Sequence, residues 1–360
     1  MSRTGWAAIL GCVLGSACGP GRAPLPGEEP LPFASDTIPT VWADVPQGAA
    51  SGDRWVVVSA DWDSAALTRF EAGRLEPLGR TRPPAYLHPF QVFSFRDTIF
   101  LSDWGKRRTT VWSSEGTLVD SIPAAEGLRG LYPRARDAAG NLYFQVEPSA
   151  GRDGSGSQDS AAIVRAAPGL TRFDTVARLS PIELARMQRE SQVRYEQRVF
   201  GGNDLWGVWP DGTVWVARRF RNQLVTHGPQ GQIHRGPLLP DPVFEISPAD
   251  RMEYLHRYPE EVRPGEMEIP WAIIHPPFYG AFTAPDGSVW LEKSKQAEDS
   301  LRRLHVVDRS GNLTRVLVLK GQARLIAVGA RTLLLGERTT AGVRLLEVRI
   351  PASPPGPAPQ

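Results

Sequence analysis

The sequence predicts an all-β fold, a six-bladed β-propeller with four-stranded antiparallel blades. A small polar turn followed by an apolar or aromatic strand recurs six times, and the central residues of the copies are Trp55, Phe100, Tyr143, Trp215, Trp290 and Leu334. The intervals between these residues are 45, 43, 72, 75 and 44. Three intervals match the period of a propeller blade, and the other two are about 30 residues longer. Radial repeats of this kind often exceed the average domain size, so 360 residues fit one domain.

Each repeat divides into four strands, which in the second repeat cover 91–95, 98–102, 109–113 and 117–122. The turn between the third and fourth strands carries a glycine in five repeats, where positive φ costs glycine little: Gly73, Gly116, Gly169, Gly231 and Gly311.

The last repeat contains only three strands, 324–328, 332–336 and 343–350, before a proline-rich end. We therefore expect residues 37–43 to supply its outer strand. This pairing would close the ring and protect an open sheet edge.

The two long intervals contain insertions, at about 179–203 and about 237–279. Ser180-Pro181 and Ser247-Pro248 each place serine at a helix N-cap and proline at the first helical position, with an acidic residue two positions later. Both insertions connect an outer strand to the next inner strand, and such connections lie on one face of a propeller, the top face. We expect two helical insertions that form a lid above the channel.

The N-terminus has the layout of an export signal, because a 12-residue apolar stretch, 6–17, follows Arg3 and ends in small residues. Residues 14–18, Leu-Gly-Ser-Ala-Cys, resemble the lipobox of bacterial lipoproteins, although the leucine lies four residues before the cysteine instead of three. The resemblance implies a signal peptide at 1–17, lipidation of Cys18, and a place in the bacterial cell envelope, periplasmic or surface-facing. Cleavage after Ala17 to a free exported protein is the alternative, followed by an uncleaved anchor or a cytoplasmic protein.

The composition separates the folded body from its two ends. Residues 18–36 are rich in proline and glycine and are predicted to be an extended tether, residues 37–350 form the propeller, and 351–360 are predicted to be a disordered tail. The only cysteines are Cys12 and Cys18, so the body has no disulfide, thiolate metal site or cysteine nucleophile.

Residues 103–116 are similar to the NHL consensus, with an Asp, a short polar turn, an Arg and an aromatic strand that ends at Gly. On these residues the chain resembles six-bladed propellers of the NHL-repeat and TolB-like kind, especially exported bacterial lipoproteins. The resemblance implies the fold over about 37–350. It also implies a ligand- or protein-binding or scaffolding module that acts through its top face.

The enzymatic alternative is a metal-assisted hydrolase or lyase, similar to propeller lactonases, with a site in the central channel. No ligand motif of those enzymes transfers to this sequence, so catalytic and metal-binding residues remain unassigned. We predict no cofactor; a Ca²⁺ or other divalent ion in the channel belongs to the enzymatic alternative. No nucleotide-binding glycine motif and no Gly-x-Ser-x-Gly elbow occurs, which disfavours kinases, dehydrogenases and serine hydrolases.

Three groups of residues are candidates for ligand contact on the top face. His88 and His275 occur in similar His-Pro-Phe and His-Pro-Pro-Phe contexts, and Tyr279 follows the second; their other interpretation is that each imidazole caps a backbone group. Trp271, in the second insertion, either anchors the lid or contacts a ligand. The basic residues in two loops could attract an anion or a lipid headgroup, or could pair with glutamates of the second insertion: Lys106, Arg107, Arg108, Arg218, Arg219 and Arg221.

The charge balance narrows the class of partner. With 41 Lys and Arg against 39 Asp and Glu the net charge is +2, which excludes nucleic-acid binding by bulk electrostatics. We expect a monomer that contacts the membrane through its lipid, with an envelope protein or a small anionic ligand as partner.

Overall fold

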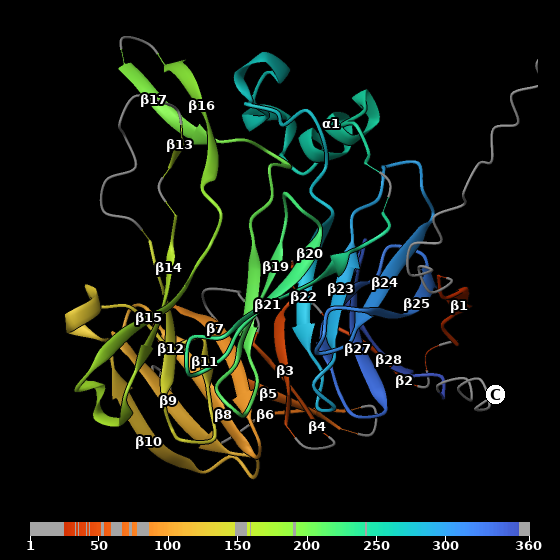
Figure 1. Cartoon of the computed structure of the whole chain (residues 1–360). Helices are drawn as coiled ribbons and strands as arrows, with labels where there is room; N and C mark the ends of the chain where they lie inside the picture. The colour runs from red at the N-terminus through yellow and green to blue at the C-terminus, as the bar shows by residue number, and fades with distance from the viewer. Residues whose placement is uncertain are drawn as a thin grey trace, which may run out of the picture.

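The computed structural model describes residues 25–32, 34, 36–40, 42, 44–51, 54–58, 67–71, 74–77, 86–147, 157–158, 160–189, 192–241 and 243–352. Over these residues the chain is all-β with one α-helix, and its antiparallel sheets form a β-propeller (Figure 1). Cys18 and the predicted signal peptide lie outside the described residues.

Six sheets follow one another along the described chain, each written here from its inner to its outer strand. The first contains β3 (Gln47–Ser51), β4 (Arg54–Val58), β5 (Leu67–Glu71) and β6 (Arg74–Pro77), and the second contains β7 (Pro89–Phe95), β8 (Thr98–Asp103), β9 (Arg108–Ser113) and β10 (Leu118–Pro123). The third contains β11 (Ala135–Arg136), β12 (Leu142–Val146), β14 (Ala162–Ala166) and β15 (Phe173–Arg178).

The fourth sheet contains β18 (Leu205–Val208), β19 (Val214–Arg218), β20 (Gln223–His227) and β21 (Ile233–Leu238). The fifth contains β22 (Phe278–Thr283), β23 (Val289–Lys293), β24 (Leu301–Val307) and β25 (Leu313–Lys320), and the sixth contains β26 (Arg324–Val328), β27 (Thr332–Thr339) and β28 (Gly342–Arg349). The strands predicted for the second and last repeats are therefore present.

The inner strands of these sheets form a closed ring. β3 contacts β7, and the contacts continue through β11, β18, β22 and β26 back to β3. The same strands line one central cavity of about 660 Å³. Between the sheets the recurring aromatic residues are buried, as expected for a core position: Trp215 is 1% exposed and Trp290 4% exposed.

The turn chemistry agrees with the strand order. Gly116, Gly169, Gly231 and Gly311 have φ of 82°, 77°, 88° and 86°, as predicted for the turn between the third and fourth strands. Gly73 lies outside the described residues. The other short elements are 3₁₀ turns: η1 (Glu126–Leu128), η2 (Pro168–Leu170), η3 (Glu260–Val262) and η4 (Glu266–Glu268).

The outer strand of the last sheet comes from the start of the chain, as predicted. β2 (Asp36–Pro39) is antiparallel to β28, with Thr37 opposite Leu346 and Ile38 opposite Leu345. This pairing protects an edge that would otherwise expose unpaired backbone groups. Residues 41 and 43 of the predicted strand lie outside the described residues.

The segment predicted to be a tether contributes a strand of its own, which corrects that prediction for residues 28–30. β1 (Glu28–Pro30) pairs in parallel with β25, with Glu28 opposite Val316. Glu29 also binds Arg315, at 2.7 Å. The open edge of β25 offers backbone partners that a polar, proline-rich composition does not reveal.

The first insertion is not helical, so the helix predicted from Ser180 is wrong. β16 (Ile182–Arg189) and β17 (Gln192–Gln197) form an antiparallel hairpin, and β13 (Ser157–Gln158) pairs with β16. The Ser180 N–H donates to the buried carboxylate of Asp204 at 2.7 Å. Pairing with a second strand therefore outweighed the local N-cap signal, which is worth only about 1 kcal/mol.

The second insertion contains the predicted helix. α1 (Pro248–Leu255) starts at the N-cap Ser247, and Asp250 completes a capping box with it. The two insertions contact each other. Val199 forms an isolated parallel β-bridge with Trp271, and Arg198 Nη1 donates to the Trp271 carbonyl at 3.0 Å. Figure 1 shows both rising on the same side of the sheets. In the part of the chain that the structure describes, no helix is long and apolar enough to cross a membrane.

Candidate functional site: a roofed pocket beneath the helix

A cavity of about 360 Å³ lies beneath α1, and we call it the roofed pocket. Its walls come from the start of β22, from the loop after β23, and from the starts of β24 and β26. The segment that joins β17 to β18 lies on another side. The lining residues are Gln197, Arg198, Val199, Phe200, Gly201, Gly202, Asp250, Glu253, Tyr254, Arg257, His275, Tyr279, Lys295, Gln296, Ala297, Arg302 and Arg324.

Asp250 holds the roof in place. Its Oδ2 accepts hydrogen bonds from the backbone N–H and the hydroxyl of Ser247, both at 2.8 Å, and its Oδ1 accepts from the Ala297 N–H at 2.8 Å. Burial alone would raise the pKa of Asp250, but the His275 imidazole beside it and the hydrogen bonds from Ser247 outweigh this effect and lower the pKa below its usual value. The ionised carboxylate thus joins α1 to the loop after β23.

His275 connects Asp250 to Tyr279, so the structure brings two of the predicted site residues together. His275 Nε2 lies 3.1 Å from Oδ2 of Asp250, at ion-pair distance but outside hydrogen-bond geometry. His275 Nδ1 lies 2.5 Å from the Tyr279 hydroxyl. Burial, and next the Asp250 charge, raise the pKa of Tyr279, so its hydroxyl stays protonated beside the imidazole.

Three basic side chains, Lys295, Arg302 and Arg324, line the pocket together with Tyr279. Arg302 pairs with Glu292 at 2.9 Å, and Arg324 is 3.7 Å from the same carboxylate. Lys295 donates to the carbonyl oxygens of Asp299 and Gln296, at 2.8 and 3.3 Å. Among the described residues Lys295 has no carboxylate within ion-pair distance. Burial and the nearby Arg302 lower its pKa.

Trp271, predicted either to anchor the lid or to contact a ligand, packs against residues of both insertions. Its ring stacks on Phe200, with centroids 6.0 Å apart, and meets the edge of Tyr254 at 5.5 Å. Its indole N–H donates to the Glu266 carbonyl at 2.9 Å. These contacts match the anchoring interpretation, and Trp271 does not line the roofed pocket.

The predicted residues of the second repeat lie apart from the roofed pocket. The buried Asp103 carboxylate accepts from the His88 N–H at 2.9 Å, and the imidazole lies beside Trp104. Arg107 pairs with Glu126 at 2.7 Å. Lys106 and Arg108 flank it, and none of these four predicted residues, His88 included, lines the pocket.

The basic residues of the fourth repeat also lie outside it. Arg218 pairs with Asp204 at 2.8 Å. Arg219 is 6% exposed and donates to the carbonyl oxygens of Gly201 and Gly202. Two of these arginines thus hold the connection between β17 and β18 in place, while Arg221 is exposed.

The pocket residues that the sequence analysis did not identify as site candidates include Asp250, Lys295, Arg302 and Arg324. The capping pattern after Ser247 points to Asp250 as a cap, but nothing local indicates that its second oxygen reaches another blade. No motif marks the three basic residues. Among the described residues, no three His, Cys, Asp or Glu side chains are grouped so that they could share a metal ion.

Comparison with known proteins gives only distant structural likenesses. No protein-family model and no curated protein matches the chain. The calcium-binding protein regucalcin from Agrobacterium tumefaciens is 11% identical, with 90% of this chain and 97% of that chain covered and a TM-score of 0.41. A member of the DUF4221 family from Bacteroides vulgatus is 8% identical, with 86% and 92% covered and a TM-score of 0.45. Virginiamycin B lyase from Staphylococcus aureus is 12% identical, with 88% of each chain covered and a TM-score of 0.38.

Proposed function

We propose that this protein is a binding module that holds a small anionic ligand in the roofed pocket. The observation that carries the proposal is Lys295, a half-buried cation that lines the pocket without a carboxylate partner among the described residues. Arg302 and Arg324 share one carboxylate, that of Glu292, while the acidic charges that act on Lys295, those of Glu253, Asp299 and Asp250, form no ion pair with it. A carboxylate or phosphate group would supply that ion pair, since such groups accept charge-assisted hydrogen bonds from Lys and Arg.

The proposal includes the wider setting of the molecule. We assign six blades, supported by the six successive sheets and the closed ring of inner strands. The export signal and the lipobox-like residues before Cys18 support a lipid-anchored protein of the bacterial cell envelope. β2 covers the edge of β28, and the edge strand that remains is short and ends at Pro39, which fits a monomer.

The test is a binding measurement with defined anions. Citrate, glucuronate, inorganic phosphate and sulfate are titrated against the protein by calorimetry, with thermal stability as a second readout. We expect one of them to bind, and Lys295→Gln to weaken that binding at least about tenfold. Arg221→Gln is the matched control, because Arg221 is an exposed cation outside the pocket. Equal affinity in Lys295→Gln and the parent protein would refute the assignment.

A second candidate is an enzyme. It is favoured by the arrangement in which His275 lies between Asp250 and Tyr279. His275, with the Asp250 carboxylate at its other ring nitrogen, could accept the proton of the Tyr279 hydroxyl, and the resulting phenolate could then remove a proton from a bound ligand. This candidate requires turnover of a bound ligand, followed by mass spectrometry. Tyr279→Phe would then abolish turnover while binding persists. If the parent protein binds a ligand and leaves it unchanged, the enzyme is refuted and only the binding module remains. Ca²⁺ and Zn²⁺ are added in parallel, as the metal-assisted form of this candidate requires.

A further inference from the structure

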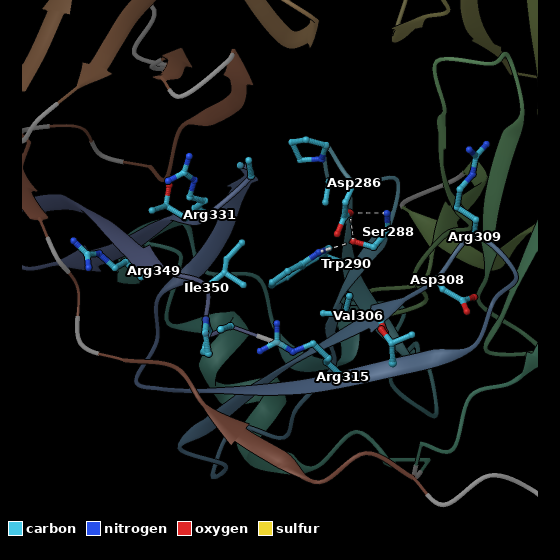
Figure 2. A pocket seen from close by; sticks show the side chains of 18 residues that line it. Asp286, Ser288, Trp290, Val306, Asp308, Arg309, Arg315, Arg331, Arg349 and Ile350 are labelled. Carbon is cyan, nitrogen blue, oxygen red and sulfur yellow. Dashed lines mark hydrogen bonds between the residues drawn. The ribbon is translucent and has the colours of Figure 1, made fainter. Parts of the chain in front are cut away.

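A larger cavity, of about 1140 Å³, lies at the opposite end of the fifth and sixth sheets (Figure 2). Tyr279, near the start of β22, lines the roofed pocket, whereas Ala284, just after the end of β22, lines this cavity. The turn after β24 and the turn after β26 complete the wall. We call this cavity the lower pocket. The turns after β22, β24 and β26, which line it, are together called the lower rim.

Four arginines line the lower pocket, and two of them have no acidic partner. Arg309 pairs with Asp211, and Arg315 pairs with Glu29 at 2.7 Å. Among the described residues Arg331 and Arg349 have no ion pair, and both are exposed. Figure 2 shows both on one side of the pocket, with Arg309 on the other.

The two aspartates that line the pocket are already engaged in their own turns. Asp286 accepts from the N–H and the hydroxyl of Ser288, at 2.8 and 2.7 Å. Asp308 accepts from the Ser310 and Asn312 N–H groups at 2.8 and 2.9 Å. These carboxylates therefore bind backbone donors and leave Arg331 and Arg349 available to an external anion.

Part of the wall of the lower pocket is apolar. Trp290, Val306 and Ile350 line it between the basic side chains, as Figure 2 shows. A basic rim above an apolar wall fits an amphiphile, in which an anionic group is attached to a hydrocarbon part, better than it fits a small inorganic ion.

The N-terminal segment enters the fold at the lower rim. β25 begins just after the turn at Asp308, on the lower rim, and β1 runs parallel to it, so the residues before Glu28 approach from that rim. Leu31 also packs on the core cluster that includes Trp290 and Val306. Leu25 lies seven positions after Cys18, and this stretch spans at most about 25 Å, so a lipid on Cys18 would hold the lower rim close to a membrane.

We propose that the lower pocket binds the phosphate of an anionic phospholipid headgroup, with Arg331 and Arg349 as its ligands. The lower rim then faces the membrane, and the roofed pocket points away from it. The headgroup site stands on the cavity and its arginines; only the orientation rests on the lipid anchor of the proposed function. A lipid phosphate shares its chemistry with free phosphate, and the position of the N-terminal segment favours the lipid.

The test measures vesicle binding without the lipid anchor. The mature chain from residue 18, with Cys18→Ser, is sedimented with vesicles of phosphatidylcholine alone or with about one third phosphatidylglycerol. We expect binding to the anionic vesicles only, and an affinity about thirtyfold lower in the double variant Arg331→Gln/Arg349→Gln, at about 1 kcal/mol for each arginine. Circular dichroism and melting temperature show that the variant remains folded.

Two controls separate this site from the roofed pocket. Lys295→Gln should keep vesicle binding, and the double arginine variant should keep whatever anion the roofed pocket binds, so either proposal can fail alone. Inorganic phosphate is tested as a competitor and as a thermal stabiliser. Equal binding of the parent and double variant to anionic vesicles would overturn the proposal. Stabilisation by phosphate through these arginines, without vesicle binding, would overturn the lipid assignment and identify a free-phosphate site.

Discussion

The substitution Asp250→Asn tests whether one carboxylate holds the roof of the pocket. The side chain accepts from the Ser247 N–H, the Ser247 hydroxyl and the Ala297 N–H, and its Oδ2 lies 3.1 Å from His275 Nε2. Asparagine keeps one acceptor oxygen and turns an N–H₂ group toward the remaining donors, so at least one buried N–H loses its partner. Each such loss costs about 1–3 kcal/mol, and charge-assisted bonds lie at the upper end.

We expect the opening of α1 to become easier by about 3 kcal/mol, which is roughly a hundredfold in its equilibrium constant. Hydrogen exchange with mass spectrometry measures this, because amide exchange in a locally opening helix follows that equilibrium. Peptides that cover 248–256 should exchange faster, while β25 should be unchanged. Glu253→Gln is the control on the same helix, since the Glu253 side chain is 57% exposed. If Asp250→Asn and Glu253→Gln exchange alike, the carboxylate does not hold the roof.

Two further predictions concern the body of the propeller. Burial lowers the pKa of His305 to about 4, against the opposing charge of Asp241, so below a pH of about 6.5 the unfolded chain binds a proton that the folded one does not. The free energy of unfolding should therefore fall by up to about 3 kcal/mol as the pH drops toward 4. In urea unfolding, His305→Gln should not show this part of the decrease, whereas His234→Gln, at an exposed position, should still show it. Identical pH profiles of the two variants would contradict the assignment. Leu345→Ala, at a fully buried position opposite β2, should lower the free energy of unfolding by about 2–5 kcal/mol. Leu118 is 51% exposed, so Leu118→Ala should change it by less than about 0.5 kcal/mol. Similar urea midpoints of the two variants would contradict the burial of Leu345.

The repeat was readable from the sequence because its signals are local and recur. A polar turn, an alternating strand and a glycine with positive φ each depend on a few neighbouring residues, and the same pattern repeats from Trp55 to Leu334. The pairing of β2 with β28 was also predictable, because a last repeat with three strands leaves one edge open. The local signal failed in the first insertion. Ser180-Pro181 resembles a helix start, yet the segment that follows, β16, pairs with β17.

The candidate site was predictable only in part. His275 and Tyr279 were identified because they lie next to an inner strand, where propeller loops meet the channel. Their partner Asp250 is about 25 residues away in sequence, and Lys295 and Arg324 come from other blades, so no spacing pattern connects them. Arg218 and Arg219, by contrast, matched a basic loop but bind Asp204 and the Gly201 and Gly202 carbonyl oxygens within the fold.

The sequence by itself determined the strands of the repeats, their turns and the closing strand, since each follows from hydrophobic alternation, glycine conformation and the count of strands in a repeat. Only the tertiary structure decided which charges are satisfied and which face a cavity. Lys295 and Arg331 have the same local signature as paired surface cations. Their lack of a carboxylate partner among the described residues depends on how neighbouring blades place their acidic residues, such as Glu292 and Asp286. Local pattern cannot encode that placement, because it arises from contacts between residues far apart in the chain.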